Sequence, residues 1–236
     1  MKLTLSLIIC SLLFSCIQNK NATELKFSKL STQYLLTNEI SMKNRDIVEG
    51  GSSYLIDFNN KTYLCTAKHL TRSSMGFEPS MDLKTFKDSV TYWKAFPRNN
   101  KLVTDTLFID DLFFFDEDYD DLILLSLKNN SKNIGVLHPN FNKLKKGTRV
   151  RILGCEYEDY ECFQKEYYGT LNKYTIIDQI EIFMDSLNIS TAGFSGAPVL
   201  DEKNQVIGHV LGGGDFGNGI LKLYIAPIGL IKKILK

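Results

Sequence analysis

Ser195, His69 and Asp121 have the residue types and surroundings needed for nucleophilic catalysis. Ser195 lies between glycines in the segment "GFSGAPV". A serine hydroxyl is a weak nucleophile until a base removes its proton, and a third group must orient that base. We expect His69 to be the base and Asp121 to orient it, which predicts attack of Ser195 on a carbonyl carbon.

Only one of the three histidines stands where a catalytic base is expected. His69 ends the strand-like run "YLCTAKHL", and the chain is expected to turn into a short helix just after it, so the ring can face a cleft. His138 precedes Pro139 in a polar stretch, which indicates a surface residue. His209 alternates along "QVIGHVL" and is interpreted as a structural histidine with satisfied hydrogen bonds.

Asp121 is the last carboxylate of an acidic run and directly precedes the apolar run "LILLSL". Charge runs are usually solvated, but a carboxylate at this junction can be partly buried. It then needs a partner, and an imidazole N–H is a natural one. The alternating aspartates also suggest a calcium loop, but Asp121 stands where an EF-hand needs glycine and no Glu follows at the twelfth position. A calcium loop is therefore not expected.

Two glycines give the segment around Ser195 a physical reason for its composition. The oxygen that becomes negative on the attacked carbonyl needs donors, and the N–H groups of Gly193 and Ser195 are the expected oxyanion hole. Gly193 permits an unusual backbone angle, and Gly196 lets the turn continue without a clashing Cβ atom. This chemistry requires no cofactor, and no Cys-x-x-Cys pair provides a cysteine framework for a metal such as zinc.

Short β-like runs separated by turn residues fill the chain, and residues 59–60, both Asn, are a hairpin signal. Only two stretches look helical: the few residues after His69 and the end of the chain, where Pro227 suits a helix start. This pattern predicts an all-β fold, either a sandwich or barrels.

The N-terminal residues predict export. A positive start and an apolar run are typical of a signal peptide, and the run is too short to span a membrane, which takes about 20 apolar residues. "LFSC" resembles the bacterial lipobox, so Cys16, at the end of the predicted signal peptide 1–16, is the expected lipidation site. The alternative is an ordinary cleaved signal with a chance cysteine. Residues 17–45 are expected to be a tether or an inhibitory segment, and the protein is placed in the bacterial cell envelope, on a membrane surface or in the periplasm.

Charge and cysteine content limit the partners. The formal net charge of +1 provides no field that would recruit nucleic acid, and membrane contact is expected only through the lipid anchor. Cys65 lies in an apolar run and is expected to be a buried thiol. Cys155 and Cys162 flank "EYEDYE", a spacing that can close a hairpin disulfide outside the cytoplasm.

The order His, Asp, Ser is that of chymotrypsin-like enzymes, whereas subtilisins and α/β-hydrolases use other orders. "TAKHL", "DLILL" and "GFSGAPVL" resemble the histidine, aspartate and serine motifs of trypsin-like (chymotrypsin-fold) bacterial serine proteases. The resemblance covers nearly the whole mature chain. It implies two antiparallel β-barrels, residues 46–138 and 139–236, the second with a short C-terminal helix, and it places the catalytic residues at His69, Asp121 and Ser195.

Two residues depart from the pattern of this family. Phe194 replaces the common Asp or Asn before the nucleophile, which excludes activation by a freed N-terminus that pairs with that Asp. Ile123 replaces a small residue and is expected to alter packing more than chemistry. A dinucleotide fingerprint, Gly212-x-Gly214-x-x-Gly217, is also present, but a strand follows it instead of a helix, so nucleotide binding is not expected.

The resemblance places the pocket for the residue before the cut bond at Ile189, with Ser190, Leu211 and Gly213 around it. No acidic residue lies at its base, so a preference for Lys or Arg is not expected. Glutamyl endopeptidases carry a histidine in the strand before the glycines, but here His209 is one residue too early, which turns it to the other face of the strand. A small or medium apolar side chain is predicted instead.

The predicted function is that of a serine endopeptidase acting on protein or peptide substrates. The first alternative is a catalytically inactive protease-fold binding module on the cell surface. The second is an unrelated β-rich lipoprotein, structural or ligand-binding, in which His69 and Ser195 lie far apart.

Overall fold

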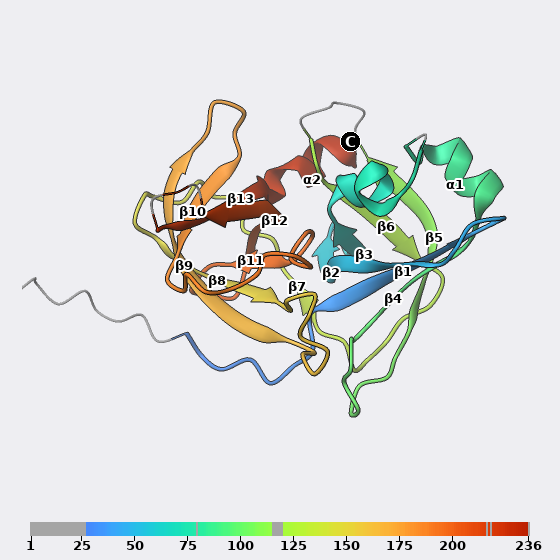
Figure 1. Ribbon diagram of the computed structural model, residues 1–236, viewed down its shortest axis with the longest axis horizontal. Coiled ribbons are helices and arrows are strands. Elements are labelled where there is room, and N and C mark those ends of the chain that lie inside the picture. Colours follow the sequence, from blue (N-terminus) through green and yellow to red (C-terminus); the bar gives the residue numbers. More distant parts are fainter. Residues whose placement is uncertain (1–26, 79, 115–119, 216, 218, 236) are drawn as a thin grey trace, which may run out of the picture.

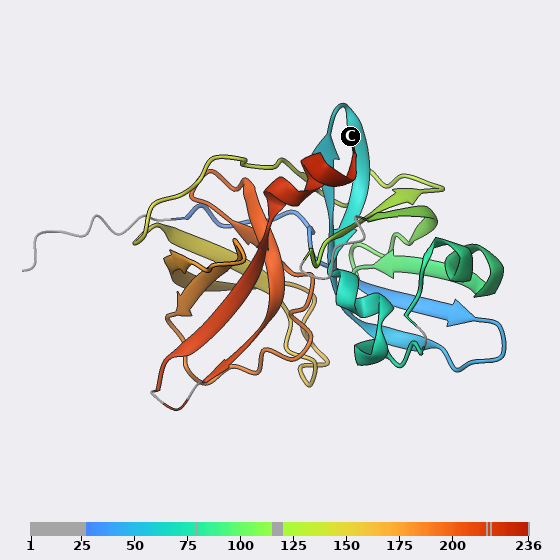
Figure 2. The same cartoon turned by 90° about the horizontal axis from the view of Figure 1, so that it is seen from above.

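Two β-barrels stand side by side in the computed structural model, which describes residues 27–78, 80–114, 120–215, 217 and 219–235 (Figures 1 and 2). The predicted signal peptide and the predicted lipidation site Cys16 lie outside the described residues. Within the described ranges, no helix has the length and apolar character needed to cross a membrane.

Six antiparallel strands close the first barrel in the order β1-β4-β5-β6-β3-β2, with β2 also paired to β1. These strands are β1 (Leu36–Met42), β2 (Val48–Phe58), β3 (Lys61–Thr66), β4 (Val90–Phe96), β5 (Leu107–Phe114) and β6 (Ile123–Leu127). The short strand β7 (Val136–Leu137) adds to β2 in parallel.

The second barrel is closed in the order β10-β13-β12-β11-β8-β9. Its strands are β8 (Arg149–Gly154), β9 (Lys165–Tyr174), β10 (Ile180–Met184), β11 (Pro198–Leu200), β12 (Val206–Asp215) and β13 (Leu221–Pro227). A 3₁₀ turn (Ile228–Leu230) and helix α2 (Ile231–Ile234) follow. The predicted all-β fold of two barrels with a short C-terminal helix is therefore confirmed.

Apolar side chains fill each barrel, as the β-like runs predict. Ile123, one of the two departures from the family pattern, is fully buried in the first barrel, in the same core cluster as Trp93 and Leu107. The β2–β3 turn has φ values of 52° at Asn59 and 60° at Asn60. Two positive φ angles are what a two-residue hairpin turn requires, and asparagine tolerates them.

The first barrel begins earlier than the sequence predicts. β1 lies inside residues 17–45, a segment expected to be a tether or an inhibitor. Its sequence "LTNEISM" mixes polar and apolar residues, and it pairs as a strand with both β2 and β4. Residues 27–35, which precede β1, run along the second barrel (Figure 1). There the fully buried guanidinium of Arg151 donates to the Ser28 carbonyl at 2.8 Å and faces the Phe27 ring. The described part of this segment is therefore docked.

Helix α1 (Leu83–Ser89) is a further difference from the sequence prediction. Asp82 caps it by accepting the N–H of Thr85 at 2.6 Å, a common way to satisfy the free donors of a first turn. Only the 3₁₀ turns Lys68–Thr71 and Ser73–Met75 occupy the stretch after His69 where a short helix is expected.

Candidate active site

The ends of two neighbouring strands bring His69 and Asp121 together. β3 and β6 are antiparallel neighbours in which Thr66 pairs with Ile123, so the residues after β3 meet those before β6. Nδ1 of His69 lies 2.6 Å from Oδ2 of Asp121, and the backbone N–H of His69 donates to Oδ1 at 2.7 Å. Two contacts therefore hold the carboxylate against the imidazole.

The Asp121 carboxylate is partly shielded, with its side chain 22% exposed. Burial by itself raises the pKa of this carboxyl, but the hydrogen bonds and charge of His69 outweigh burial, and the pKa is lowered from its usual value. Asp121 is therefore ionised at neutral pH and accepts the hydrogen bond from Nδ1 of His69. In a neutral ring this leaves Nε2 without a proton, which is the state that a general base needs.

Two glycines shape the turn that carries Ser195. Gly193 and Gly196 have φ values of 95° and 86°, in the region that favours glycine. A Cβ atom on Gly196 would also collide with the backbone oxygen of Ser52 and the hydroxyl of Thr66, both in the first barrel. Glycine at 196 is therefore required by the close contact between the barrels as well as by its backbone angle.

Phe194 fixes this turn to the core of the second barrel. Its side chain is fully buried, and its ring centroid lies 5.0 Å from that of Tyr167. A Cβ atom on Gly154 would lie 2.9 Å from the Phe194 ring, so β8 has no side chain where the ring packs. Apolar packing thus holds the turn where an Asp or Asn is common in the resembling proteases.

Ser52 in β2 joins the turn of Ser195 to the strand that leads to His69. Its N–H donates to the Ser195 carbonyl at 2.7 Å, and its hydroxyl donates to the Gly193 carbonyl at 2.8 Å. Its own carbonyl accepts the hydroxyl of Thr66 at 2.6 Å. Thr66 ends the strand that leads into His69. These bonds therefore link the backbone next to His69 to the backbone of the Ser195 turn.

The Ser195 hydroxyl makes a hydrogen bond to a backbone carbonyl. It donates to the Leu211 carbonyl oxygen at 3.2 Å, and no hydrogen bond joins it to His69 among the described residues. Transfer of the proton to His69 therefore requires the hydroxyl to rotate away from Leu211. Hydrogen bonds of catalytic groups are often long or misaligned before substrate binds.

His209 in β12 contacts the backbone of Asp121. Its fully buried ring has Nε2 2.8 Å from the Asp121 carbonyl oxygen, whereas Nδ1 has no partner among the described residues. Burial lowers the pKa of His209 to about 4, so the ring is neutral and Nε2–H is the donor. The sequence predicts a fully satisfied structural histidine, and the structure shows one satisfied nitrogen. His138 is exposed, as predicted.

The predicted oxyanion donors make no hydrogen bond within the part of the chain that the structure describes. The N–H groups of Gly193 and Ser195 donate to no other described residue, so both are free to bind a ligand oxygen. In the same ranges, no cluster of three or more His, Cys, Asp or Glu side chains is close enough to hold a metal ion.

The predicted pocket residues lie around the turn of Ser195, but some of them contact the core of the second barrel and others contact neighbouring loops. Ile189 and Leu211 pack partly against the core of the second barrel, and Leu211 also lines a cleft of about 570 Å³ beside α2. The hydroxyl of Thr191 donates to the Gly213 carbonyl at 3.1 Å and so joins two stretches of the predicted wall. Ser190 donates its N–H to the Glu156 carboxylate at 2.9 Å.

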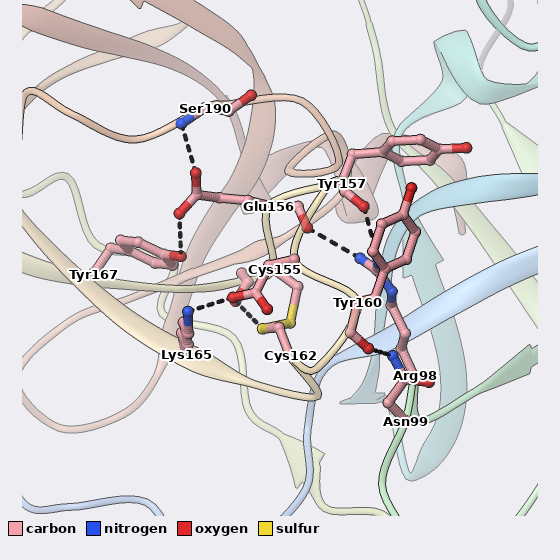
Figure 3. A network of polar contacts seen from close by, with 12 residues as sticks. Arg98, Asn99, Cys155, Glu156, Tyr157, Tyr160, Cys162, Lys165, Tyr167 and Ser190 are labelled. Atoms are coloured by element: carbon pink, nitrogen blue, oxygen red, sulfur yellow. Dashed lines mark hydrogen bonds and ion pairs between the residues drawn. A yellow bond between two sulfur atoms is a disulfide. The ribbon is translucent and has the colours of Figure 1, made fainter.

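A disulfide-closed loop, drawn in Figure 3, lies against Gly193 of the predicted oxyanion hole. Cys155 and Cys162, the two cysteines that the sequence pairs, form a disulfide with a Cα–Cα distance of 5.7 Å. We call residues 155–162 the disulfide loop. A cleft of about 500 Å³ lies beside this loop between the barrels, with Gly193 in its lining. Cys65 is a free, buried thiol, and burial raises its pKa to about 12.

Sequence reasoning missed several residues that support these groups. Ser52 stands in "GGSSY", and Glu156 stands in an acidic run, so neither has a local pattern that distinguishes it from a surface residue. Their roles depend on contacts with the nucleophile turn, which lies far away in the chain.

The comparisons with known proteins agree with this fold. The family described as trypsin-like peptidase domain matches residues 51–208. No curated protein matches the sequence.

Several solved structures have the same architecture at low sequence identity. The serine endoprotease from Yersinia pestis has a TM-score of 0.58 at 16% identity over 86% of this chain, which spans 62% of that protein. A Glu endopeptidase has a TM-score of 0.57 at 14% identity over 84% of this chain and 88% of its own. A protease from M. tuberculosis in its active form has a TM-score of 0.55 at 14% identity over 86% of this chain and 79% of its own. These likenesses show the fold, and because the family match extends over most of the chain, the chain belongs to the trypsin-like peptidase family.

Proposed function

We propose that this chain is a serine endopeptidase in which Ser195, His69 and Asp121 are the catalytic residues. The observation that carries the proposal is the His69–Asp121 pair, held by hydrogen bonds of 2.6 Å and 2.7 Å. Ser52 joins Thr66, at the end of the strand that leads to His69, to the turn of Ser195 in the other barrel. A scaffold without chemistry does not require an ionised aspartate behind an imidazole.

In the proposed mechanism, Ser195 attacks the carbonyl carbon of a peptide bond while Nε2 of His69 takes its proton. Asp121 keeps the proton of the neutral ring on Nδ1 and stabilises the imidazolium that forms. The N–H groups of Gly193 and Ser195 stabilise the negative oxygen. His69 then gives its proton to the leaving amine, which leaves the acyl group on Ser195. Water attacks this acyl group while His69 takes a proton from the water, and His69 returns the proton to Ser195 as the acyl group leaves.

The proposed substrates are proteins or peptides with a small or medium apolar residue before the cut bond. Ile189, Ser190, Leu211 and Gly213 are the proposed pocket residues. The support is their place beside the Ser195 turn, together with the apolar character of Ile189 and Leu211.

We further propose export and a lipid anchor at Cys16, since the sequence "LFSC" follows an apolar run. The test is a fatty-acid label in a cell that exports the protein. The label should bind the parent and be lost in Cys16→Ser. Equal labelling of both proteins would show that Cys16 is not the lipidation site, and it would leave the catalytic proposal unchanged.

The catalytic proposal is tested with purified protein, a peptide library and a fluorophosphonate probe, which reacts only with an activated serine. The parent should cut the library and bind the probe. Ser195→Ala should bind no probe and keep only about 10³-fold acceleration over water from the remaining groups. Equal turnover by parent and variant would exclude Ser195 as the nucleophile.

The alternative of an inactive binding module makes a different prediction for one contact of Ser195. The Ser195 hydroxyl donates to Leu211 instead of His69, and an inactive protein would keep that bond permanently. This alternative predicts a folded parent protein that neither cuts the library nor binds the probe.

A further inference from the structure

The carbonyl of Ala192 and the N–H of Gly193 belong to one peptide unit. In a planar trans peptide these two groups point in opposite directions, so a partner that holds the oxygen also aims the N–H. The N–H of Tyr157 donates to the Ala192 oxygen at 2.9 Å. The direction of one predicted oxyanion donor therefore depends on the position of Tyr157 in the disulfide loop.

The disulfide loop holds the nucleophile turn at two further points. The Glu156 carboxylate accepts the N–H of Ser190 through Oε2 at 2.9 Å, and the hydroxyl of Tyr167 through Oε1 at 3.3 Å. A Cβ atom on Gly193 would lie 2.8 Å from the Cys155 carbonyl oxygen, so the two backbones touch directly. A shift of the loop is therefore transmitted to the turn.

Arg98, which follows β4 in the first barrel, holds the loop from the opposite side (Figure 3). Its two terminal nitrogens donate to the carbonyls of Glu156 at 3.1 Å and Tyr157 at 2.7 Å. Hydrogen bonds from a charged donor are stronger than neutral ones, and a guanidinium can bind two acceptors in a fixed geometry. Asn99 adds a bond to the Tyr160 carbonyl.

We propose that Arg98 and the disulfide loop form a positioning device for the oxyanion hole. Arg98 fixes the backbone of Glu156 and Tyr157, the Tyr157 N–H fixes the Ala192 oxygen, and the Gly193 N–H is thereby aimed at the reacting carbonyl. Arg98 is a positioning residue, because among the described residues both of its hydrogen bonds go to the loop and none goes to His69, Asp121 or Ser195. The inference rests on the proposed endopeptidase function.

The test separates aiming of the Gly193 N–H from general binding. A peptide aldehyde adds to Ser195 and places its oxygen in the hole, whereas the corresponding peptide alcohol binds without that adduct. The peptide sequence is the best one from the library, and the substrate for kinetics is the same peptide with a coumarin leaving group. This leaving group is not a peptide, so Arg98 cannot act through a residue after the cut bond.

Arg98→Gln should lower kcat about tenfold with little change in KM. Removing an oxyanion donor lowers kcat by about 10²- to 10³-fold, and a donor that is present but poorly aimed should cost less than one that is removed. It should weaken aldehyde binding about tenfold relative to alcohol binding. The Cys155→Ala/Cys162→Ala double variant should show the same selective loss, because it releases the other end of the same loop.

Arg45→Gln is the matched control. Arg45 also donates to two carbonyls, those of Gly76 at 3.3 Å and Glu78 at 2.9 Å, but within the first barrel. Its aldehyde-to-alcohol affinity ratio should equal that of the parent. If Arg98→Gln does not fold, Arg98→Lys replaces it, because lysine keeps the charge but offers one nitrogen for two carbonyls.

A folded Arg98 variant with the affinity ratio and kcat of the parent overturns the inference. Equal weakening of both ligands also overturns it, because the effect is then not specific to the oxyanion. A parent that neither cuts the substrate nor prefers the aldehyde refutes the endopeptidase function itself, and this inference with it.

Discussion

Nε2 of His209 lies 2.8 Å from the backbone carbonyl oxygen of Asp121, so a buried ring of the second barrel contacts the backbone of the first. Two residues further along β12, the Leu211 carbonyl accepts the Ser195 hydroxyl. Between them, the Val210 carbonyl accepts the N–H of Gly196 at 2.8 Å. Three consecutive residues of β12 thus contact Asp121 and the turn of Ser195.

The buried ring of His209 predicts a pH-dependent stability. Burial lowers the pKa of His209 to about 4, from an ordinary value of 6.5. Between these values the unfolded chain binds a proton that the folded chain does not, so the free energy of unfolding falls as pH drops through this window. The loss from this one residue should reach about 3 kcal/mol at pH 4.

Urea unfolding from pH 7 to pH 4 measures this effect, in a Ser195→Ala background that prevents self-digestion. His209→Gln keeps a donor for Asp121 but does not titrate, so its stability should fall less over the same range. His138→Gln, at an exposed histidine, should follow the background. Parallel curves for His209→Gln and the background would contradict the lowered pKa.

Gly196→Ala should destabilise the protein more than Gly147→Ala, although both glycines have a φ of 86°. Alanine in this backbone region costs about 1–2 kcal/mol by itself. A Cβ atom at 147 meets no atom within 4 Å, whereas one at 196 collides with the backbone of Ser52. The difference in unfolding free energy should therefore exceed about 2 kcal/mol, and denaturant unfolding in the Ser195→Ala background measures it.

Asp121→Asn should lower kcat by about 10⁴-fold at neutral pH, because an amide can donate to Nδ1 and so favour the wrong tautomer of His69. Asp120→Asn is the control. This neighbouring carboxylate is also shielded, but it pairs with Lys233 at 3.3 Å instead of His69. The measurement is the rate at which each variant hydrolyses the library-derived substrate. Similar rates for the two variants would show that Asp121 has no special role in catalysis.

Glu166→Gln should destabilise the second barrel by about 2 kcal/mol, since it leaves the fully buried Arg151 charge without its carboxylate partner at 2.9 Å. The same carboxylate accepts the N–H of Leu30 at 3.2 Å, so hydrogen exchange in residues 27–35 should also rise. Glu202→Gln, on an exposed turn, should change neither quantity. Unchanged exchange in Glu166→Gln would indicate that the N-terminal segment docks independently of this ion pair.

Local patterns were sufficient to predict an all-β fold and the hairpin at residues 59–60, because strand alternation and turn residues depend on near neighbours in the chain. The choice of two barrels over a sandwich came from the family resemblance. Local patterns were insufficient for β1 and α1. The sequence of β1 mixes polar and apolar residues without a clear alternation, and its pairing with β2 and β4 holds it as a strand. The seven residues of α1 carry a weak helical signal beside the strand-forming sequence of β4.

The sequence by itself determined which residues are candidates for chemistry: a serine between glycines, a histidine at the end of a strand and an aspartate at the start of another. Only the tertiary structure decided what holds them. Ser52, Arg98, Glu156 and His209 act through backbone groups of residues far away in the chain, and no spacing rule relates such partners. The physical reason is that their contacts form only where the nucleophile turn and the two barrels meet.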